Sequence, residues 1–217
     1  MSPAAPMLVI ASGNAGKLRE FSQLFAPLGL RIRPQPEALR VEESGASFAE
    51  NARLKAVAVA HACGSWALAD DSGLSVDALA GAPGVHSARY GASDPERIER
   101  LLGELAAAQA RAPGRAADRS ARFTAALALA DPCGQVLLEV EGVCPGIILE
   151  QPRGQGGFGY DPVFLVPELG LSFAEMEPAL KGRISHRGRA LAKLLPGLRQ
   201  LLAEHEDCEP GLAGSDP

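Results

Sequence analysis

The most constraining feature of this chain is the apolar run at residues 66–69, which is followed at once by Asp70, Asp71, Ser72 and Gly73. Such a run is typical of the end of a buried strand. Because side chains alternate along an extended chain, Asp70 and Asp71 are expected to point to opposite sides, one facing a cleft and one a neighbouring element. Open α/β sheets hold ligands at the carboxyl ends of strands, where acidic oxygens suit Mg²⁺. Taken alone, the stretch favours a turn, since Asp, Ser and Gly are ordinary turn residues.

The composition fits a globular protein with a substantial core. The chain has 217 residues, of which 47% are hydrophobic, enough for one large domain or two small lobes. Its net charge of −5 gives no broad electrostatic footprint for nucleic acid. No two of the four cysteines have C-x-x-C spacing, so the sequence suggests neither a zinc site nor a redox pair. Free thiols indicate a reducing, cytoplasmic location.

The two ends of the chain are expected to lie outside the folded domain. Residues 1–6 have no basic or long apolar segment, so we interpret them as a flexible extension and not as a signal peptide. Residues 204–217 are polar and rich in Gly, Pro and acidic side chains, which predicts a disordered tail. A single domain is therefore expected over residues 7–203. No apolar stretch approaches the length of a membrane span.

The chain opens with a strand, a glycine-containing turn and a helix. Residues 7–11 predict a buried strand, residues 12–16 a turn, and a helix is expected from near Lys17. This arrangement aims backbone N–H groups and the positive end of a helix at an anion, and Lys17 adds a full charge. The stretch is not a Walker A loop, because Ala11 replaces the first glycine and Leu18 replaces the Ser/Thr.

The middle of the chain carries a second acidic pair and further elements. Glu42 and Glu43 precede a capping-box pattern, Ser47 to Glu50, and a helix is expected from there to about residue 62. Lys55 lies on that helix; a lysine there is more often a solvated surface residue, but it could reach a phosphate if that face lines the cleft. Residues 74–90 are expected to form an ordered loop, followed by a helix from about residue 93. Residues 122–130 and 136–143 predict two strands joined by a hairpin turn at 131–134.

A glycine-rich segment and a basic cluster follow. Residues 154–159 match G-x-G-x-x-G, but no strand precedes them and no helix follows, so the dinucleotide-binding interpretation fails. Within this segment Phe158 could stack on a base, or could simply be a core residue. Lys181, Arg183, His186 and Arg187 precede a last helix, expected over about residues 189–202. Cations at a helix N-terminus oppose its dipole, which favours an anionic or hydrogen-bonding ligand.

Taken together, these blocks resemble the Ham1/RdgB family of inosine triphosphate pyrophosphatases. The order and spacing of the blocks carry the resemblance, and they cover essentially the whole folded chain. They lie at residues 12–17, 42–45, 47–56, 69–73, 81–84, 87–90, 156–162 and 184–188.

The resemblance implies an α/β fold with an elongated mixed β-sheet flanked by helices and two lobes around a central cleft. It also implies a homodimer and an Mg²⁺-dependent hydrolase. The implied reaction converts the non-standard purine nucleotides ITP, dITP and XTP to the monophosphate and pyrophosphate, which cleanses the nucleotide pool. No nucleic-acid or membrane partner is expected.

The resemblance also assigns site residues. Those implied to hold the triphosphate and touch the substrate are Ser12, Gly13, Asn14, Ala15, Gly16, Lys17 and Ser72. Those implied to recognise base and sugar are Phe158, Gly159, Tyr160, Asp161, Lys181, His186 and Arg187. Glu42 and Asp71 are the implied Mg²⁺ ligands, and Asp71 is also the implied general base. Lys55, Asp70 and Arg89 are supporting residues. The turn expected at 70–73 would then present Asp71 to metal and water.

The chemistry agrees with this assignment. Water must attack the α-phosphorus while cations hold the negative charge, and a carboxylate can orient and deprotonate that water. Hypoxanthine and xanthine carry a 6-oxo acceptor, whereas adenine carries a 6-amino donor. Adenine would therefore leave donors of the His186–Arg187 segment unpaired. For guanine, which shares the 6-oxo group, we hypothesise a clash with the 2-amino group.

Two alternatives stay open on the sequence. One is a Maf-type house-cleaning nucleotide pyrophosphatase, which the segments 158–161 and 185–187 argue against. The other is a non-catalytic nucleotide-binding module, which the intact acidic groups argue against. A panel of nucleotide substrates distinguishes the three.

Overall fold

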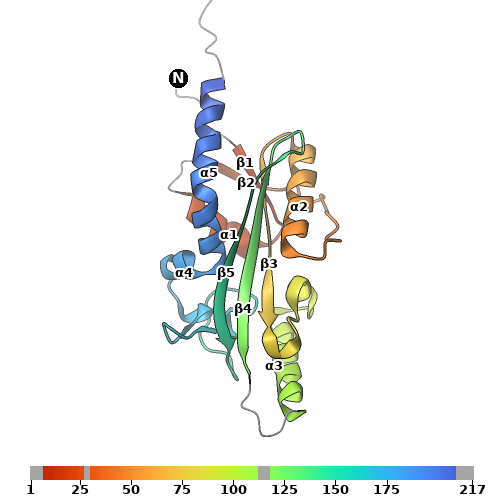
Figure 1. Cartoon of the computed structure of the whole chain (residues 1–217), viewed down its shortest axis with the longest axis vertical. Coiled ribbons are helices and arrows are strands. Elements are labelled where there is room, and N and C mark those ends of the chain that lie inside the picture. Colours follow the sequence, from red (N-terminus) through yellow and green to blue (C-terminus); the bar gives the residue numbers. More distant parts are fainter. Residues whose placement is uncertain (1–6, 27–29, 112–117, 209–217) are drawn as a thin grey trace, which may run out of the picture.

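The computed structural model describes residues 7–26, 30–111 and 118–208, so the extension expected at residues 1–6 and most of the tail expected after residue 203 lie outside it. Its centre is one seven-stranded mixed sheet in the order β2-β1-β3-β4-β5-β6-β7 (Figure 1). The strands are β1 (Met7–Ala11), β2 (Arg31–Pro34), β3 (Ala67–Val76), β4 (Ser120–Ala130), β5 (Val136–Ile148), β6 (Phe164–Val166) and β7 (Leu171–Ser172). The helices are α1 (Ala15–Phe25), α2 (Phe48–Cys63), α3 (Asp94–Ala110), α4 (Pro178–Ile184) and α5 (His186–Cys208).

The sheet is parallel on one side of β3 and antiparallel on the other. β1 pairs in parallel with β2 and β3, whereas β3 to β7 pair antiparallel. β1 ends at Ala11, opposite Ala69 of β3. The turn that leads into α1 therefore lies beside the Asp70–Asp71 pair.

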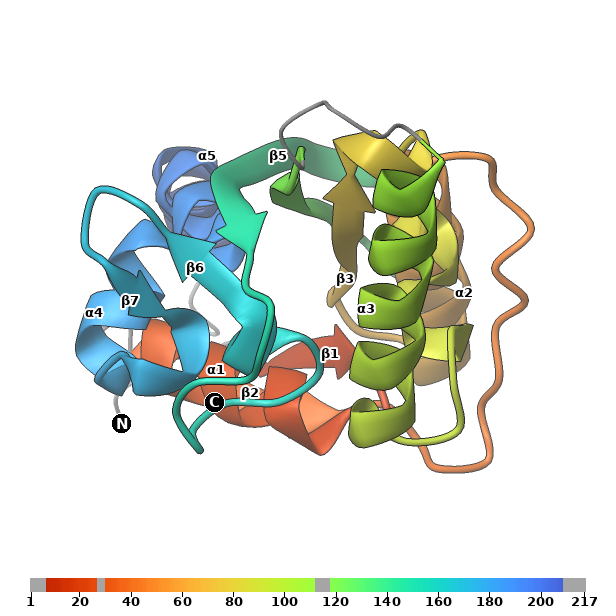
Figure 2. The same cartoon turned by 90° about the horizontal axis from the view of Figure 1, so that it is seen from below.

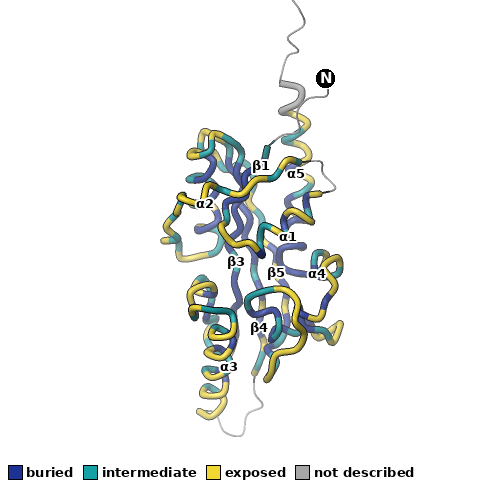
Figure 3. The backbone as a smooth tube through the Cα atoms, turned by 180° about the vertical axis from the view of Figure 1, so that it is seen from behind, coloured by how far each residue is buried: buried dark blue, intermediate teal, exposed yellow. Residues whose placement is uncertain are grey.

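In the upper part of the molecule as drawn in Figure 1, helices cover both faces of the sheet. α1 and α5 pack on one face, through Phe21, Phe25, Leu191 and Leu194. The Ala-rich face of α2 packs on the other, against alanines of β3 and β4. Figure 3 shows the buried strands running through the middle of the molecule, with exposed segments outside them.

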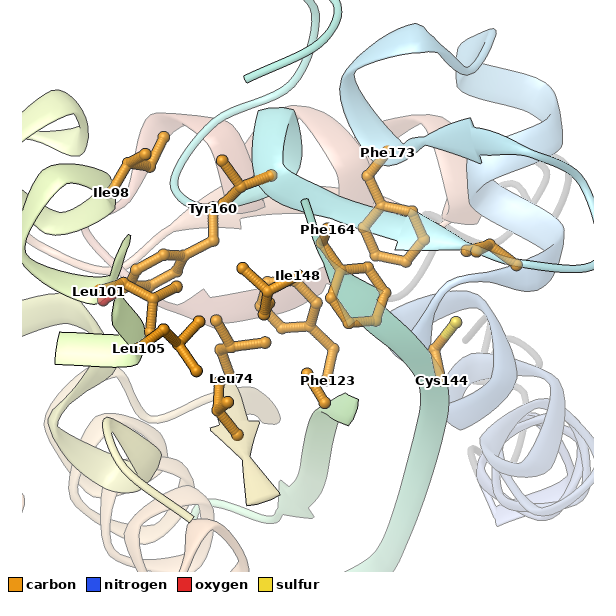
Figure 4. Packing of buried hydrophobic residues seen from close by; sticks show 14 of the residues in the cluster. Leu74, Ile98, Leu101, Leu105, Phe123, Cys144, Ile148, Tyr160, Phe164 and Phe173 are labelled. Carbon is orange, nitrogen blue, oxygen red and sulfur yellow. The ribbon is translucent and has the colours of Figure 1, made fainter. Parts of the chain in front are cut away.

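A separate cluster fills the lower part, where the long strands extend beyond α1 and α2. There Ile98, Leu101 and Leu105 of α3 face Leu74 of β3, and Phe123, Phe164 and Phe173 pack together (Figure 4). Seen from below, α3 lies on one side of this region and β6, β7 and α4 lie on the other (Figure 2). The expected α/β fold with an elongated mixed sheet is confirmed.

The turn expected at residues 70–73 is wrong. β3 continues through these residues to Val76, and Asp70, Asp71, Ser72 and Gly73 each pair with a residue of β4. Ten residue pairs join the two strands and outweigh the turn composition. Glycine is required at position 73 for packing, because a Cβ there would lie 2.5 Å from Ser87 Oγ and 2.6 Å from the Gly84 carbonyl oxygen.

Other boundaries also differ from expectation. The loop expected at 74–90 contains the end of β3 and two 3-10 segments, Asp77–Leu79 and Gly84–Arg89. α4 was not predicted, and the last helix begins at His186, not at residue 189. α5 runs past residue 204, where the tail was expected to begin, to Cys208. The hairpin turn at 131–134 is confirmed by the Gly134 N–H, which donates to the Asp131 carbonyl.

Candidate active site

The glycine turn after β1 is organised by Asn14, the N-cap of α1. Its Oδ1 accepts hydrogen bonds from the backbone N–H groups of Gly16 (2.8 Å) and Lys17 (3.1 Å). Residues 13–15 are exposed, as a turn open to a ligand would be. The Ser12 and Asn14 amides also have acceptors within the protein, the Ile10 carbonyl and the Ser12 hydroxyl, so an anion at this turn would rely on Lys17 and on the Gly13 and Ala15 amides.

Two lysines from opposite faces of the sheet meet at Asp70. Lys17 Nζ of α1 and Lys55 Nζ of α2 each donate to the backbone carbonyl of Asp70, both at 3.1 Å. Lys17 also pairs with Asp70 Oδ2 at 3.2 Å, and Lys55 with Asp71 Oδ1 at 2.7 Å. The two carboxylates thus reach different lysines, so the predicted alternation of Asp70 and Asp71 is confirmed. The result is two cations and two anions within one small volume.

Asp70 is a fully buried anion held by cations. Arg187 Nε donates to its Oδ2 at 2.8 Å, in addition to Lys17. Burial opposes ionisation, but Arg187 and Lys17 outweigh it and hold the pKa of Asp70 well below its usual range. Burial also lowers the pKa of Lys17. Among the described residues, Asp70 Oδ1 has no hydrogen-bond partner.

Asp71 has a different electrostatic environment. Burial raises the pKa of its carboxyl group, against the opposing effect of the Lys55 ammonium. Burial alone would lower the pKa of Lys55. The nearby carboxylates, Asp71 first, outweigh burial, so the pKa of Lys55 is raised overall. Lys55 also pairs with Glu43 Oε1 at 3.1 Å, and Glu43 Oε2 pairs with Arg89 at 2.6 Å. Lys55 is therefore shared by two carboxylates. Glu42, which precedes Glu43 in the sequence, is exposed.

A chain of charged side chains leads from Asp70 towards the glycine-rich loop. Arg187 reaches Ser72 Oγ (2.7 Å) and Glu20 Oε2 (2.8 Å). Lys181 Nζ then bridges Glu20 Oε1 and Asp161 Oδ2, both at 2.7 Å. Burial raises the pKa of Asp161. Burial also acts to raise the pKa of Glu20, but the positive charges of Arg187 and Lys181 outweigh burial, so the Glu20 pKa is lowered. The chain joins α1, α4 and α5 to the segment at 158–161.

This charged chain borders a cavity of about 760 Å³. Phe158, Lys181, Arg187 and Glu20 line it, together with Gly16. The Phe158 ring packs directly on Gly16, since a Cβ at Gly16 would lie 2.7 Å from the ring. Lys181 Nζ and Arg187 Cζ lie 5.2 and 5.3 Å from the ring centroid. An aromatic face with nearby donors can hold a planar, polar ligand such as a nucleobase.

A sequence model of the Ham1 family matches residues 8–197. The chain belongs to the Ham1 family. A dITP/XTP pyrophosphatase from Synechococcus sp. (strain CC9311) is 58% identical to it over 212 residues, 97% of each chain. Another, from Parasynechococcus marenigrum (strain WH8102), is 58% identical over 90% of this chain and 96% of its own. Among solved structures, a HAM1 protein from Coxiella burnetii has a TM-score of 0.79 and 43% identity, covering 90% of this chain and 99% of its own.

The structure of this Ham1-family protein gathers most of the predicted site residues. Lys17, Lys55, Asp70, Asp71 and Arg187 form one network, and Ser72, Phe158, Asp161 and Lys181 connect to it. His186 lies elsewhere: it is buried and stacks on Phe123, with ring centroids 4.6 Å apart, and burial keeps its pKa well below the usual value. Tyr160 is also buried, and its hydroxyl donates to the Ser87 carbonyl.

Sequence reasoning missed Glu20, which bridges Lys181 and Arg187. A signal was present, because Glu20 follows Lys17 by three residues and so lies on the same face of the predicted helix. In the part of the chain that the structure describes, no group of three or more His, Cys, Asp or Glu residues could hold a metal ion. Within that same part, no helix is long and apolar enough to span a membrane. The cysteines described there, Cys63, Cys133 and Cys144, are free.

Proposed function

We propose that this Ham1-family protein is a nucleoside-triphosphate pyrophosphatase that converts dITP, ITP and XTP to the monophosphate and pyrophosphate. One observation carries the proposal. A curated relative that is 58% identical over 97% of both chains is named a dITP/XTP pyrophosphatase. The geometry agrees with it, since Lys17 and Lys55 meet close to an aromatic cavity large enough for a base.

The phosphate chain is proposed to bind at the turn of residues 12–17 and at the two lysines. Lys17 and Lys55 approach a common carbonyl oxygen from α1 and α2, so their charges are already concentrated before substrate arrives. Preorganised cations stabilise charge that develops on phosphoryl oxygens without reorganising in the transition state. Arg187 lies between this centre and the cavity, next to Ser72, where it can contact both phosphate and base.

Asp71 is the proposed general base. Its carboxyl group lies beside Lys55 and has a pKa raised by burial, which makes it a better proton acceptor than an exposed aspartate. It would orient a water molecule and take its proton as the oxygen attacks the α-phosphorus, and pyrophosphate would leave. Asp70 cannot do the same, because Arg187 and Lys17 hold it as a low-pKa anion within the protein.

Carboxylates from two segments supply the hard oxygen donors that a magnesium ion prefers. The Asp71 carboxylate pairs with Lys55, and Glu42 is exposed and adjoins in sequence Glu43, which pairs with the same ammonium group. Magnesium is commonly held by one or two carboxylates together with substrate phosphates, which agrees with the small number of acidic groups here. We propose Asp71 with Glu42 as ligands, as the family resemblance implies. When bound, the ion neutralises phosphate charge and favours ionisation of water.

Base recognition is proposed at Phe158, Lys181 and Arg187. The ring of Phe158 can stack on a purine, and the two cations beside it can donate to a 6-oxo group. Adenine, with its 6-amino group, would leave a donor unpaired, and such mismatches discriminate strongly. His186 is proposed to act through its neighbour Arg187, since its own ring is stacked on Phe123.

We also propose a cytoplasmic homodimer. The family resemblance supports the dimer, and free cysteines fit a reducing compartment. Light scattering of the purified protein measures the oligomeric state. A monomer at micromolar concentration would contradict the proposed dimer.

Pyrophosphate release from ITP, XTP, GTP and ATP, each with and without Mg²⁺, tests the proposed function. We expect Mg²⁺-dependent release from ITP and XTP in clear preference to GTP and ATP. No release from any substrate, or equal release from ITP and ATP, would contradict the proposal.

A further inference from the structure

The segment that carries Phe158 needs external contacts to hold its shape. Gly157 and Gly159 flank Phe158, and both have positive φ angles, 75° and 62°. Glycine adopts such angles at little cost, but it also leaves the unfolded or unbound loop many alternatives. The orientation of the Phe158 ring therefore depends on the hydrogen bonds that fix the two neighbouring peptides.

Three hydrogen bonds hold this segment from within or tie it to the core. Asp161 Oδ2 accepts from the Phe158 N–H at 2.8 Å and is itself held by Lys181, and the Asp161 N–H donates to the Phe158 carbonyl at 3.3 Å. The Tyr160 hydroxyl donates to the Ser87 carbonyl at 2.9 Å, and its ring lies beside Ile98 and Leu101 in the lower cluster (Figure 4). None of these hydrogen bonds engages the Gly159 N–H.

The Gly159 N–H is held from the start of α3. Asp94 Oδ2 accepts a hydrogen bond from the Gly159 N–H at 2.6 Å, although the two residues are 65 positions apart. The other oxygen of Asp94 pairs with Arg97 at 2.6 Å, and Arg97 also donates to the Gly91 carbonyl. The carboxylate is thus oriented by its own helix and presents one oxygen to the loop.

We infer that Asp94 is a positioning residue for base recognition. By fixing the Gly159 peptide, it sets the plane of Phe158 against the cavity, although it does not line the cavity itself. The inference rests on the proposed function for its substrate, and it adds a determinant on α3, a helix that contributes no residue to the phosphate centre. Its effect should fall on binding of the base, because Lys17, Lys55 and Asp71 contact other elements.

The test compares Asp94→Ala, Asp94→Asn and Glu96→Ala. Glu96 is a matched control, since it lies in the same first turn of α3 and accepts from Ala92 N–H and the Ser93 hydroxyl instead of the loop. Losing one partly exposed hydrogen bond to a carboxylate should raise the KM for ITP about fivefold in Asp94→Ala. We expect kcat to be unchanged and the preference for ITP over ATP to fall by a similar factor. Asp94→Asn retains an acceptor oxygen and should recover most of the loss.

Hydrogen exchange of the loop amides provides a readout that does not depend on activity. We expect faster exchange at residues 156–161 in Asp94→Ala and unchanged exchange there in Glu96→Ala. Wild-type exchange together with a wild-type KM for ITP in Asp94→Ala would overturn the inference. So would equal effects of Asp94→Ala and Glu96→Ala. If wild-type protein does not hydrolyse ITP, the proposed function fails, whereas the exchange result still decides whether Asp94 positions the loop. Should Asp94→Ala not fold, Asp94→Ser replaces it, because its side chain ends before the position of the Oδ2 that accepts from Gly159. Accelerated exchange at residues 156–161 in Asp94→Ser then supports the inference, and wild-type exchange contradicts it.

Discussion

Replacing Asp70 with Asn tests the electrostatic centre of the site. The Asp70 side chain is fully buried and its Oδ2 faces Arg187 Nε at 2.8 Å and Lys17 Nζ at 3.2 Å. Asparagine keeps the shape and one acceptor oxygen but removes the charge. Arg187 is itself 5% exposed at its side chain, so little water reaches it to replace the lost interaction. The variant therefore leaves a buried cation partly uncompensated.

The magnitude follows from burial. Removing one partner of a buried ion pair costs about 3–5 kcal/mol, because the other charge remains desolvated. Glu20 still pairs with Arg187, which favours the lower part of that range. For a domain of this size each kcal/mol lowers the midpoint of thermal unfolding by about 2–4 °C. We expect Asp70→Asn to unfold roughly 6–12 °C below the wild type.

The same interaction predicts a pH dependence. The folded protein holds the pKa of Asp70 below its usual value, so the carboxylate stabilises the fold fully at pH values above about 5. Below about pH 4 the unfolded chain takes up the proton before the folded chain does, and the stabilisation is progressively lost. The difference in unfolding free energy between wild type and Asp70→Asn should therefore be constant near neutrality and shrink in acid.

Circular dichroism during thermal and urea unfolding at pH 7, 5 and 3.5 measures this difference. Glu139→Gln is the control, because it neutralises a carboxylate whose ion pair with Arg53 is on the surface. We expect the control to unfold close to the wild type, since exposed pairs contribute little. The reasoning is refuted if Asp70→Asn matches Glu139→Gln at pH 7, or if its deficit grows as the pH falls.

Three further predictions concern catalysis, packing and capping. Asp71→Asn should still bind ITP, as measured by calorimetry, but its kcat should fall about 10²–10⁴-fold. A variant with wild-type kcat would show that Asp71 is not the general base. Gly16→Ala would place a Cβ 2.7 Å from the Phe158 ring and displace that ring. The KM for ITP should therefore rise with little change in kcat. An unchanged KM would mean that the Phe158 ring is not part of the base site. Ser47→Ala removes the hydroxyl that accepts from the Glu50 N–H and should cost about 1 kcal/mol of unfolding free energy by urea titration, with activity unaffected.

Much of the fold follows from local sequence patterns. The capping pattern at Ser47 and Glu50 correctly located the start of α2, and the serine does accept from the Glu50 N–H. The second half of the capping box shifts by one residue, since Glu50 accepts from Ala46. Apolar periodicity also located α1, α3 and α5, because each buries one face in a cluster. α4 was missed because it has only seven residues, with a proline at its start and an internal glycine, so its apolar face consists of little more than Leu180 and Ile184.

The error at residues 70–73 has a non-local cause. Four turn-forming residues stay extended because β4 pairs with all of them, and no window of sequence reports a partner about 55 positions away. The site shows the same limit. Residue types identified Lys17, Asp71 and Arg187 as candidates, but only the fold reveals that Glu20 joins Arg187 to Lys181. Likewise, the sequence predicts only that a helix begins near residue 93, whereas the fold shows that the Asp94 carboxylate contacts Gly159.

Hydrolysis of ITP in ¹⁸O-labelled water tests the central claim most directly. The account predicts Mg²⁺-dependent formation of IMP and pyrophosphate in equal amounts, with the label in the phosphate of IMP, because water prepared by Asp71 attacks the α-phosphorus. Label in pyrophosphate, release of orthophosphate with IDP, or no turnover of ITP by folded protein would contradict it.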